Sequence, residues 1–213
     1  MTRADMSAVR DAFVQAVQRS DRAGFDLIEL HMAHGYLLSS FLSPLSNSRK
    51  DEYGGTLQKR LRFPLEVLDA VRAAWPARKP ISVRISASDW LDDEGGFTLD
   101  DAVEVAKALK HHGCDIIDVS SAGNTPRSKP LYGRMYQLGF AERIRYDAQV
   151  PVLAVGGIQS ADHINTVIAA GCADLCAIAR GHLTDPYLTL RAAMQYGFDE
   201  PAWPKQYLAT KPR

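Results

Sequence analysis

The chain repeats one pattern five times, in which a segment with helical spacing of apolar residues precedes a short, continuous apolar run. The five runs are FDLIEL (25–30), ISVRISA (81–87), CDIIDVSSAG (114–123), VPVLAVGGI (150–158) and ADLCAIARG (173–181). Runs without polar alternation are typical of parallel strands covered by helices. Strands that alternate with helices in this way predict an α/β fold, either a doubly wound sheet or a (β/α)8 barrel.

Capping residues mark where several of the intervening helices begin. Asp5 or Ser7 is expected to cap the first helix, which Gly24 would end. Thr98 is expected to cap LDDAVEVAKALKHH, and Ser160 to cap ADHINTVIAA. Acidic residues near the start of the second of these helices and basic residues near its end agree with the helix dipole.

Polar residues and glycines follow each predicted strand, and in either architecture these strand ends meet at one edge. They are His31, His34, Tyr36, Arg84, Ser88, Ser120, Ser121, Gly156, Gly157, Arg180 and Gly181. Five strand ends that converge on one polar site favour the mouth of a barrel. A complete barrel of this kind typically needs about 250 residues, and the chain has 213. We therefore expect an incomplete (β/α)8 TIM barrel with about its last five strand–helix units, forming a single partial domain over residues 1–213.

Charge and hydropathy argue against several classes of partner. Lys plus Arg and Asp plus Glu are both 25, so no overall field indicates nucleic acid or an anionic membrane surface. No apolar run approaches the roughly 20 residues that cross a bilayer, and the charged start MTRADMSAVRDAF lacks the apolar core of a signal peptide. We expect a cytoplasmic protein without a nucleic-acid or membrane partner.

The last two predicted strands end in residues suited to a phosphate group. AVGGI, followed by a capped helix, offers backbone N–H groups at Gly156 and Gly157 without side chains in the way. Arg180 follows the next strand, and a guanidinium can bind phosphate through two N–H groups. A pair of glycines after a strand is also common in simple tight turns. The combination on the last two strands matches the usual phosphate site of barrels, and GxGxxG is absent, so a dinucleotide-binding fold is not indicated.

Proton-handling side chains follow the first strand, and a cation lies within the second. His31 and His34 can donate hydrogen bonds to a substrate oxygen and Tyr36 can donate a proton; alternatively, these are histidines satisfied within a loop. No nearby carboxylate or cysteine completes a metal site, so no metal is expected. Arg84 lies in a strand that should be buried, and either an acid such as Glu29 or Asp118 or an electron-rich ligand ring must offset its charge.

One long motif carries a family resemblance. HxxHGYLLxxFLSPxxNxRxDxYGG, from His31 to Gly55, resembles the Old Yellow Enzyme family of flavin-dependent ene-reductases, and VRISASD, DVSSAG, AVGGI and ARG follow in the family's order. The resemblance covers nearly the whole chain. It implies a (β/α)8 barrel that carries FMN and is reduced by NADPH or NADH.

The resemblance also implies roles for individual residues. His31 and His34 would hold the carbonyl or nitro oxygen of an electron-poor alkene, and Tyr36 would protonate one of its carbons. Arg84 would lie against the pyrimidine edge of the flavin. The phosphate of FMN would be held by Gly157, Arg180 and Gly181, with Ser121 nearby.

The resemblance leaves the completeness of the site and the substrate open. The family's amino-terminal strands, which contact the flavin ring, are absent from this sequence. The tail DEPAWPKQYLATK resembles the end of the reductase module in aminobenzoyl-CoA or salicylyl-CoA monooxygenase/reductase fusions, which implies an aryl-CoA thioester as substrate. Two alternatives are a noncatalytic barrel fragment that pairs with another chain or with its own copy, and a flavin-free barrel enzyme that acts on a phosphorylated metabolite.

Overall fold

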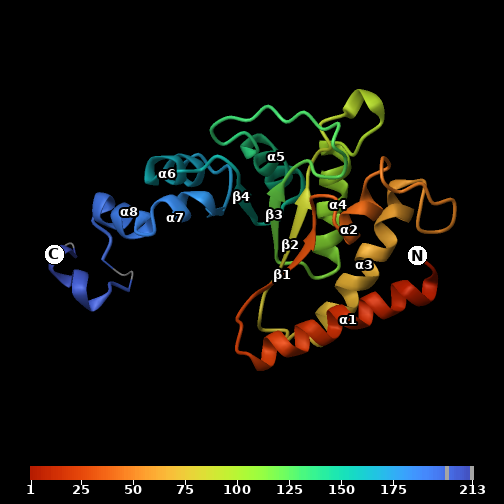
Figure 1. The fold of residues 1–213 in the computed structure, drawn as a ribbon, viewed down its shortest axis with the longest axis horizontal. Coiled ribbons are helices and arrows are strands. Elements are labelled where there is room, and N and C mark those ends of the chain that lie inside the picture. Colours follow the sequence, from red (N-terminus) through yellow and green to blue (C-terminus); the bar gives the residue numbers. More distant parts are fainter. Residues whose placement is uncertain (200–201, 212–213) are drawn as a thin grey trace.

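The fold is built on one parallel sheet. A computed structural model describes residues 1–199 and 202–211. Within these residues the sheet has five strands in the order β1-β2-β3-β4-β5, so each strand pairs with its neighbour in sequence (Figure 1). The strands are β1 (Ile28–Met32), β2 (Ile81–Ser86), β3 (Ile116–Ser120), β4 (Val152–Val155) and β5 (Leu175–Ala177). All five predicted runs therefore contain a strand.

Helices connect the strands. They are α1 (Arg3–Arg22), α2 (Leu37–Leu42), α3 (Leu57–Ala74), α4 (Leu99–His111), α5 (Leu138–Ala148), α6 (Ala161–Ala169), α7 (Arg180–Thr184) and α8 (Leu188–Tyr196), with short 3-10 helices at Asp92–Glu94 and Lys205–Thr210. A doubly wound sheet reverses its strand order at a switch point, whereas a barrel keeps sequential order. The sequential order observed here confirms the partial barrel and excludes the doubly wound alternative.

Helix starts follow the sequence with one correction. Thr98 caps α4 through a capping box with Asp101, and the Ser160 hydroxyl accepts a hydrogen bond from the His163 N–H at the start of α6, as predicted. The cap of α1 is Thr2 instead of Asp5 or Ser7. Asp5 is the third helical residue, and its carboxylate accepts a hydrogen bond from the Thr2 N–H, so the predicted acid belongs to the capping box but does not occupy the cap position.

The two faces of the sheet differ in chemistry. Side chains alternate along each strand, and Leu30, Met32, Val83, Ile85 and Val119 are at most 3 % exposed and belong to the main hydrophobic core. Core residues of α3, α4 and α5 complete this layer, among them Phe63, Val67, Leu68, Val71, Ala106, Leu109 and Ile144. Because these residues face the helices, the alternate residues of each strand face the opposite, inner side of the sheet.

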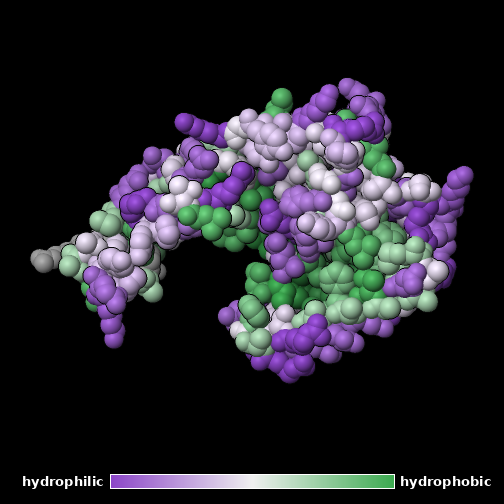
Figure 2. Space-filling model, in the orientation of Figure 1, coloured by the Kyte–Doolittle hydropathy of each residue, from purple (hydrophilic) through white to green (hydrophobic). Residues whose placement is uncertain are grey.

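The arrangement is open on one side. Figure 2 shows a hollow between α1 and the arm formed by α6, α7 and α8, with hydrophobic surface exposed along it. Leu175 on β5 is 52 % exposed, although a barrel strand is normally covered on both faces. Among the described residues, no helix combines the length and apolar content needed to span a membrane.

A buried carboxylate links the loops that follow the first three strands. Asp89 is fully buried, and its carboxylate accepts hydrogen bonds from Ser43 Oγ (2.5 Å), the Phe97 N–H (2.9 Å) and Asn124 Nδ2 (2.7 Å). Ser43 follows β1 and α2, Phe97 lies in the connection after β2, and Asn124 follows β3. One side chain thus fixes the relative positions of three loops at the carboxyl edge of the sheet.

Replacing Asp89 should destabilise the whole fold. In Asp89→Asn an amide NH2 would face one of the three donors, so we expect the free energy of unfolding to fall by about 3 kcal/mol. Urea unfolding at pH 7 measures the change. Asp93→Asn, at an exposed position, is the control and should change stability little. A loss for Asp89→Asn no larger than that of the control would contradict this role.

Candidate active site

Three polar side chains lie side by side on the inner face. The parallel register pairs His31 of β1 with Arg84 of β2, and Arg84 with Asp118 of β3. Neighbouring strands lie about 4.8 Å apart, so the three form one continuous row. The structure therefore brings together two of the predicted site residues, His31 and Arg84, and places Asp118 beside them.

Two serines hold His34 above this row. The His34 N–H donates to Ser86 Oγ (2.9 Å), and its ring Nε2 lies 2.6 Å from Ser120 Oγ. Ser86 and Ser120 are register partners one alternate position beyond Arg84 and Asp118. Ser120 was among the predicted strand-end residues, whereas Ser86 was missed; its signal was the period of two, which puts it on the same face as Arg84.

Close backbone contact also fixes the turn that carries His34. His34 has a left-handed φ of 59°, Gly35 has φ 75° and Gly123 has φ 100°. A Cβ on Gly35 would lie 2.3 Å from the carbonyl oxygen of Gly123, and a Cβ on Gly123 would lie 2.4 Å from the Cα of His34. Both positions thus require glycine, because of their φ values and because the two backbones touch.

His31, His34 and Tyr36 form one aromatic cluster. The ring centroids of His31 and His34 are 5.2 Å apart, and those of His31 and Tyr36 are 5.3 Å apart. Tyr36 is the residue before α2 and is 65 % exposed, so its phenol is open to solvent. The three predicted catalytic side chains therefore lie together at the carboxyl end of β1.

The surroundings of the two histidines favour the neutral imidazole. Burial and the charge of Arg84 lower the pKa of His34 from 6.5 to about 4, with a smaller contribution from His31. Burial and Arg84 also lower the pKa of His31, and Glu29 partly opposes them. A neutral imidazole has one N–H donor, so at neutral pH each ring can donate one hydrogen bond to an electronegative atom.

Arg84 has an acidic partner within the sheet. Its Nε lies 3.4 Å from Asp118 Oδ2, which is one of the two internal partners that the sequence left open. Burial raises the pKa of Asp118 to about 7, although Arg84 acts to lower it. The contact with Asp118 does not satisfy the hydrogen-bonding capacity of the guanidinium, because Arg84 Nε is buried without a hydrogen-bond partner.

The predicted phosphate ligands lie in the loop after β4 and in the first turn of α7, which follows β5. A Cβ on Gly181 would come 4.0 Å from the carbonyl oxygen of Ile158, so Gly181 lies close to the Gly157 turn. Gly157 has φ 70°, and Arg180, at the start of α7, is exposed. The structure thus brings Gly157, Arg180 and Gly181 to neighbouring positions; their binding of phosphate remains a prediction.

Ser121 is engaged within the protein. Its hydroxyl accepts a hydrogen bond from Trp90 Nε1 (3.0 Å) and donates to Gln137 Oε1 (2.6 Å), while Gln137 Nε2 donates to the Val155 carbonyl (2.8 Å). This chain links the loops after β2 and β3 to the end of β4. Gln137 is 2 % exposed, and the sequence alone did not single it out.

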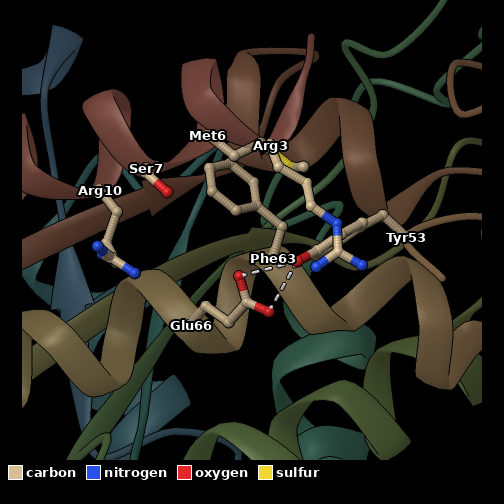
Figure 3. Close-up of a pocket in the computed structure, with 7 residues that line it drawn as sticks. All are labelled: Arg3, Met6, Ser7, Arg10, Tyr53, Phe63 and Glu66. Carbon is tan, nitrogen blue, oxygen red and sulfur yellow. Dashed lines mark hydrogen bonds between the residues drawn. The ribbon is translucent and has the colours of Figure 1, made fainter.

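A separate hollow lies between α1 and α3. It has a volume of about 240 Å³ and is lined by Arg3, Met6, Ser7, Arg10, Tyr53, Phe63 and Glu66 (Figure 3). The Tyr53 hydroxyl donates to Glu66 Oε1 (3.1 Å) across it. None of its lining residues is a predicted site residue. Among the residues that the structure describes, no three His, Cys, Asp or Glu side chains gather as a metal site would require.

Known proteins with similar sequences share one family. The model of the NADH:flavin oxidoreductase / NADH oxidase family matches residues 1–197. The chain is 46% identical over 197 residues to an NADPH dehydrogenase of Geobacillus sp. (strain WCH70), which covers 92% of this chain and 56% of that protein. It is 43% identical over 195 residues to the NADPH dehydrogenase of Bacillus subtilis (strain 168), again covering 92% of this chain and 56% of the relative. The chain thus spans a little over half the length of these relatives.

Solved structures give the same result. Histamine dehydrogenase from Rhizobium sp. 4-9 superposes with a TM-score of 0.79 at 31% identity, over 93% of this chain and 29% of that one. Morphinone reductase in complex with tetrahydroNAD gives a TM-score of 0.73 at 26% identity, over 95% of this chain and 52% of that one. A 2-naphthoyl-CoA reductase has the same fold, with a TM-score of 0.84 at 24% identity over 92% of this chain and 30% of that one. From the matched residues and the shared half-barrel, the chain belongs to the NADH:flavin oxidoreductase / NADH oxidase family.

Proposed function

We propose that this chain supplies the substrate-binding residues and part of the FMN site of an enzyme that uses NADPH or NADH to reduce an activated C=C bond. The observation that carries the proposal is the gathering of the His34 and Tyr36 rings around His31, with centroid distances of 5.2 Å and 5.3 Å, beside Arg84 at the carboxyl edge of the sheet. Active sites of barrels lie at this edge. Membership of the NADH:flavin oxidoreductase family supports the choice of chemistry.

The residues present fit FMN. Arg84 Nε and Asp118 Oδ1 are buried without hydrogen-bond partners, so Asp118 offsets the charge of the guanidinium only in part, as expected of a cation that also lies beside an electron-rich ring. Gly157 follows β4, and Arg180 and Gly181 begin the helix after β5, which is the region where barrels hold phosphate. Ser121 is the weaker candidate of this group, since its proton is already donated to Gln137.

The roles of the chain's own residues follow from geometry and charge. When bound, FMN would supply the hydride for one carbon of the alkene, after taking it from NADPH or NADH. His31 and His34, as neutral donors, hold the oxygen that is conjugated with the C=C bond and stabilise the negative charge that develops on it. Tyr36 gives its phenolic proton to the other carbon and recovers a proton from solvent, to which it is 65 % exposed.

The substrate is proposed only as a class. An electron-poor alkene with a carbonyl or nitro oxygen fits two adjacent imidazole donors. The aryl-CoA thioester expected from the tail DEPAWPKQYLATK stays a prediction, and residues 200 and 201 of that motif lie outside the described residues. A homo-oligomer, or a second chain that covers the open side, remains the alternative for completing the site.

Retention of FMN tests the proposal first. The purified chain is mixed with FMN and desalted, and its visible absorption spectrum is recorded. We expect a retained flavin band, and about tenfold weaker binding in Arg84→Met, since a charged hydrogen bond contributes about 1.5–3 kcal/mol. Arg78→Met, at an exposed position, is the control. A colourless chain would favour the noncatalytic fragment, and retention of a phosphorylated metabolite instead of FMN would favour the flavin-free enzyme.

Tyr36→Phe should slow the reaction without preventing substrate binding. Loss of a positioned general acid typically costs about 10²–10⁴ in rate, so we expect kcat to fall by this factor while KM changes little. The assay follows NADPH oxidation with an α,β-unsaturated carbonyl compound and the FMN-loaded chain. Tyr146→Phe, an exposed tyrosine on α5, is the control. An unchanged kcat in Tyr36→Phe would remove the phenol from the mechanism.

The neutral state of His34 predicts a pH dependence of stability. Its pKa is about 4 in the folded protein against 6.5 for an ordinary histidine. The unfolded chain therefore takes up the proton first, and stability is lost as pH falls from 6.5 towards 4. Asparagine tolerates the left-handed φ of this position, so His34→Asn is the suitable variant. Between pH 7 and pH 4.5 we expect its free energy of unfolding to fall by about 1–2 kcal/mol less than that of the wild type, a figure reduced for solvent screening at a half-buried ring.

Urea unfolding at the two pH values measures this difference. His111→Asn, on an exposed face at the end of α4, is the control and should behave as the wild type. Equal pH dependence in His34→Asn and the wild type would mean that His34 is not held in the neutral form.

A further inference from the structure

Asp118 lies beside Arg84 on the neighbouring strand, where its carboxylate faces the guanidinium. The two are register partners on β2 and β3, and Arg84 Nε lies 3.4 Å from Asp118 Oδ2. The Asp118 side chain is 4% exposed and that of Arg84 is 26% exposed. The carboxylate is therefore the deeper member of the pair, and the guanidinium extends towards the open inner face.

The pair is incompletely satisfied, unlike its neighbours. Among the described residues, Arg84 and Asp118 form no hydrogen bond, and Arg84 Nε and Asp118 Oδ1 are both buried without a partner. By contrast, Glu29 on β1 accepts a hydrogen bond from Ser82 Oγ (2.8 Å) on the same face. A buried pair that leaves two polar atoms unbonded contributes poorly to stability, so stability does not explain its presence.

We propose that Asp118 is a positioning residue for Arg84, which draws the Nε side of the guanidinium towards β3 and leaves both terminal nitrogens available to a ligand on the inner face. This inference rests on the proposed function for the identity of the ligand, but the contact itself does not. A planar guanidinium presents its donors in a fixed fork, so fixing one edge also fixes the direction of the other.

The groups around Asp118 make this contact sensitive to pH. Arg84 faces it from β2, Glu29 and His31 lie on β1, and Leu153 of β4 is its apolar register partner. Burial raises its pKa to about 7, Arg84 lowers it and Glu29 raises it. Arg84 also acts on His31, His34 and Tyr136, so the same guanidinium connects the pair to the ring cluster.

The sign of the pH effect follows from these charges. Above about pH 7 the Asp118 carboxylate is ionised and its charge attracts the Nε edge of the Arg84 guanidinium. Below that value Asp118 is neutral, its attraction for the guanidinium weakens, and the pair has a net positive charge. The environment of Arg84 Nε should therefore change with a midpoint near pH 7, although an arginine itself does not lose its proton there.

Nuclear magnetic resonance on the whole chain tests this without any cofactor. The ¹⁵Nε and ¹³Cζ signals of Arg84, assigned through Arg84→Lys, are followed from pH 5.5 to 8.5 together with the ¹³Cγ signal of Asp118. We expect both residues to titrate with the same midpoint in the wild type. In Asp118→Asn the Arg84 signals should no longer titrate, and the Nε–H should become more mobile.

A matched aspartate provides the control. Asp115 precedes β3 and lies 3.5 Å from Arg72, so Asp115→Asn removes another Asp–Arg contact near the same strand. This variant should leave the titration of Arg84 unchanged. The proposal is overturned if Arg84 Nε does not titrate in the wild type, if its midpoint differs from that of Asp118, or if the titration persists in Asp118→Asn. The wild-type comparison of the two midpoints decides the matter even if Asp118→Asn fails to fold.

FMN binding separates this inference from the proposed function. If the chain retains FMN, Asp118→Asn should weaken binding about threefold to tenfold, as expected for one misplaced charged hydrogen bond, and Asp115→Asn should not. If the wild type does not retain FMN, the proposed function fails for this chain. The shared titration midpoint of Asp118 and Arg84 would still establish the positioning contact. Unchanged FMN affinity in Asp118→Asn would show that Arg84 is positioned by other means.

Discussion

The parallel register of β1, β2 and β3 is the constraint on which the site depends. Because paired strands are aligned residue by residue, His31, Arg84 and Asp118 share one row, and Ser86 and Ser120 share the next. A shift of one residue in any strand would turn its polar side chains into the hydrophobic core. The helices that bury Leu30, Val83 and Val119 on the opposite face therefore also determine where the catalytic candidates lie.

Once the rows are fixed, polar contacts between loops complete the edge. Asp89 joins the loops after β1, β2 and β3, and Gln137 joins Ser121 to the end of β4. Both are buried, so every lost hydrogen bond would leave a desolvated group. The edge of the sheet is thus held as one unit, which suits a site that must keep two imidazoles and a phenol within a few ångströms of one another.

The sequence predicted the strands and the polar residues at their ends because both depend on local patterns. Apolar runs located all five strands, and the polar residues that end them included His31, His34 and Tyr36. Roles that depend on contacts distant in sequence were not accessible. Asp89 in ISASD looks like an ordinary loop acid, and only the fold brings Ser43 and Asn124 to it. The choice between Glu29 and Asp118 as partner of Arg84 likewise required the geometry of the row.

The contact between Gly35 and Gly123 limits how this chain can vary. These residues lie on different β/α units. A side chain on either glycine would overlap the backbone of the other segment. Exchanging one β/α unit for that of a relative would therefore succeed only if the new loop also has a glycine at the contact position. A side chain at Gly123, far along the chain from His34, would therefore displace the histidine as surely as a change beside it.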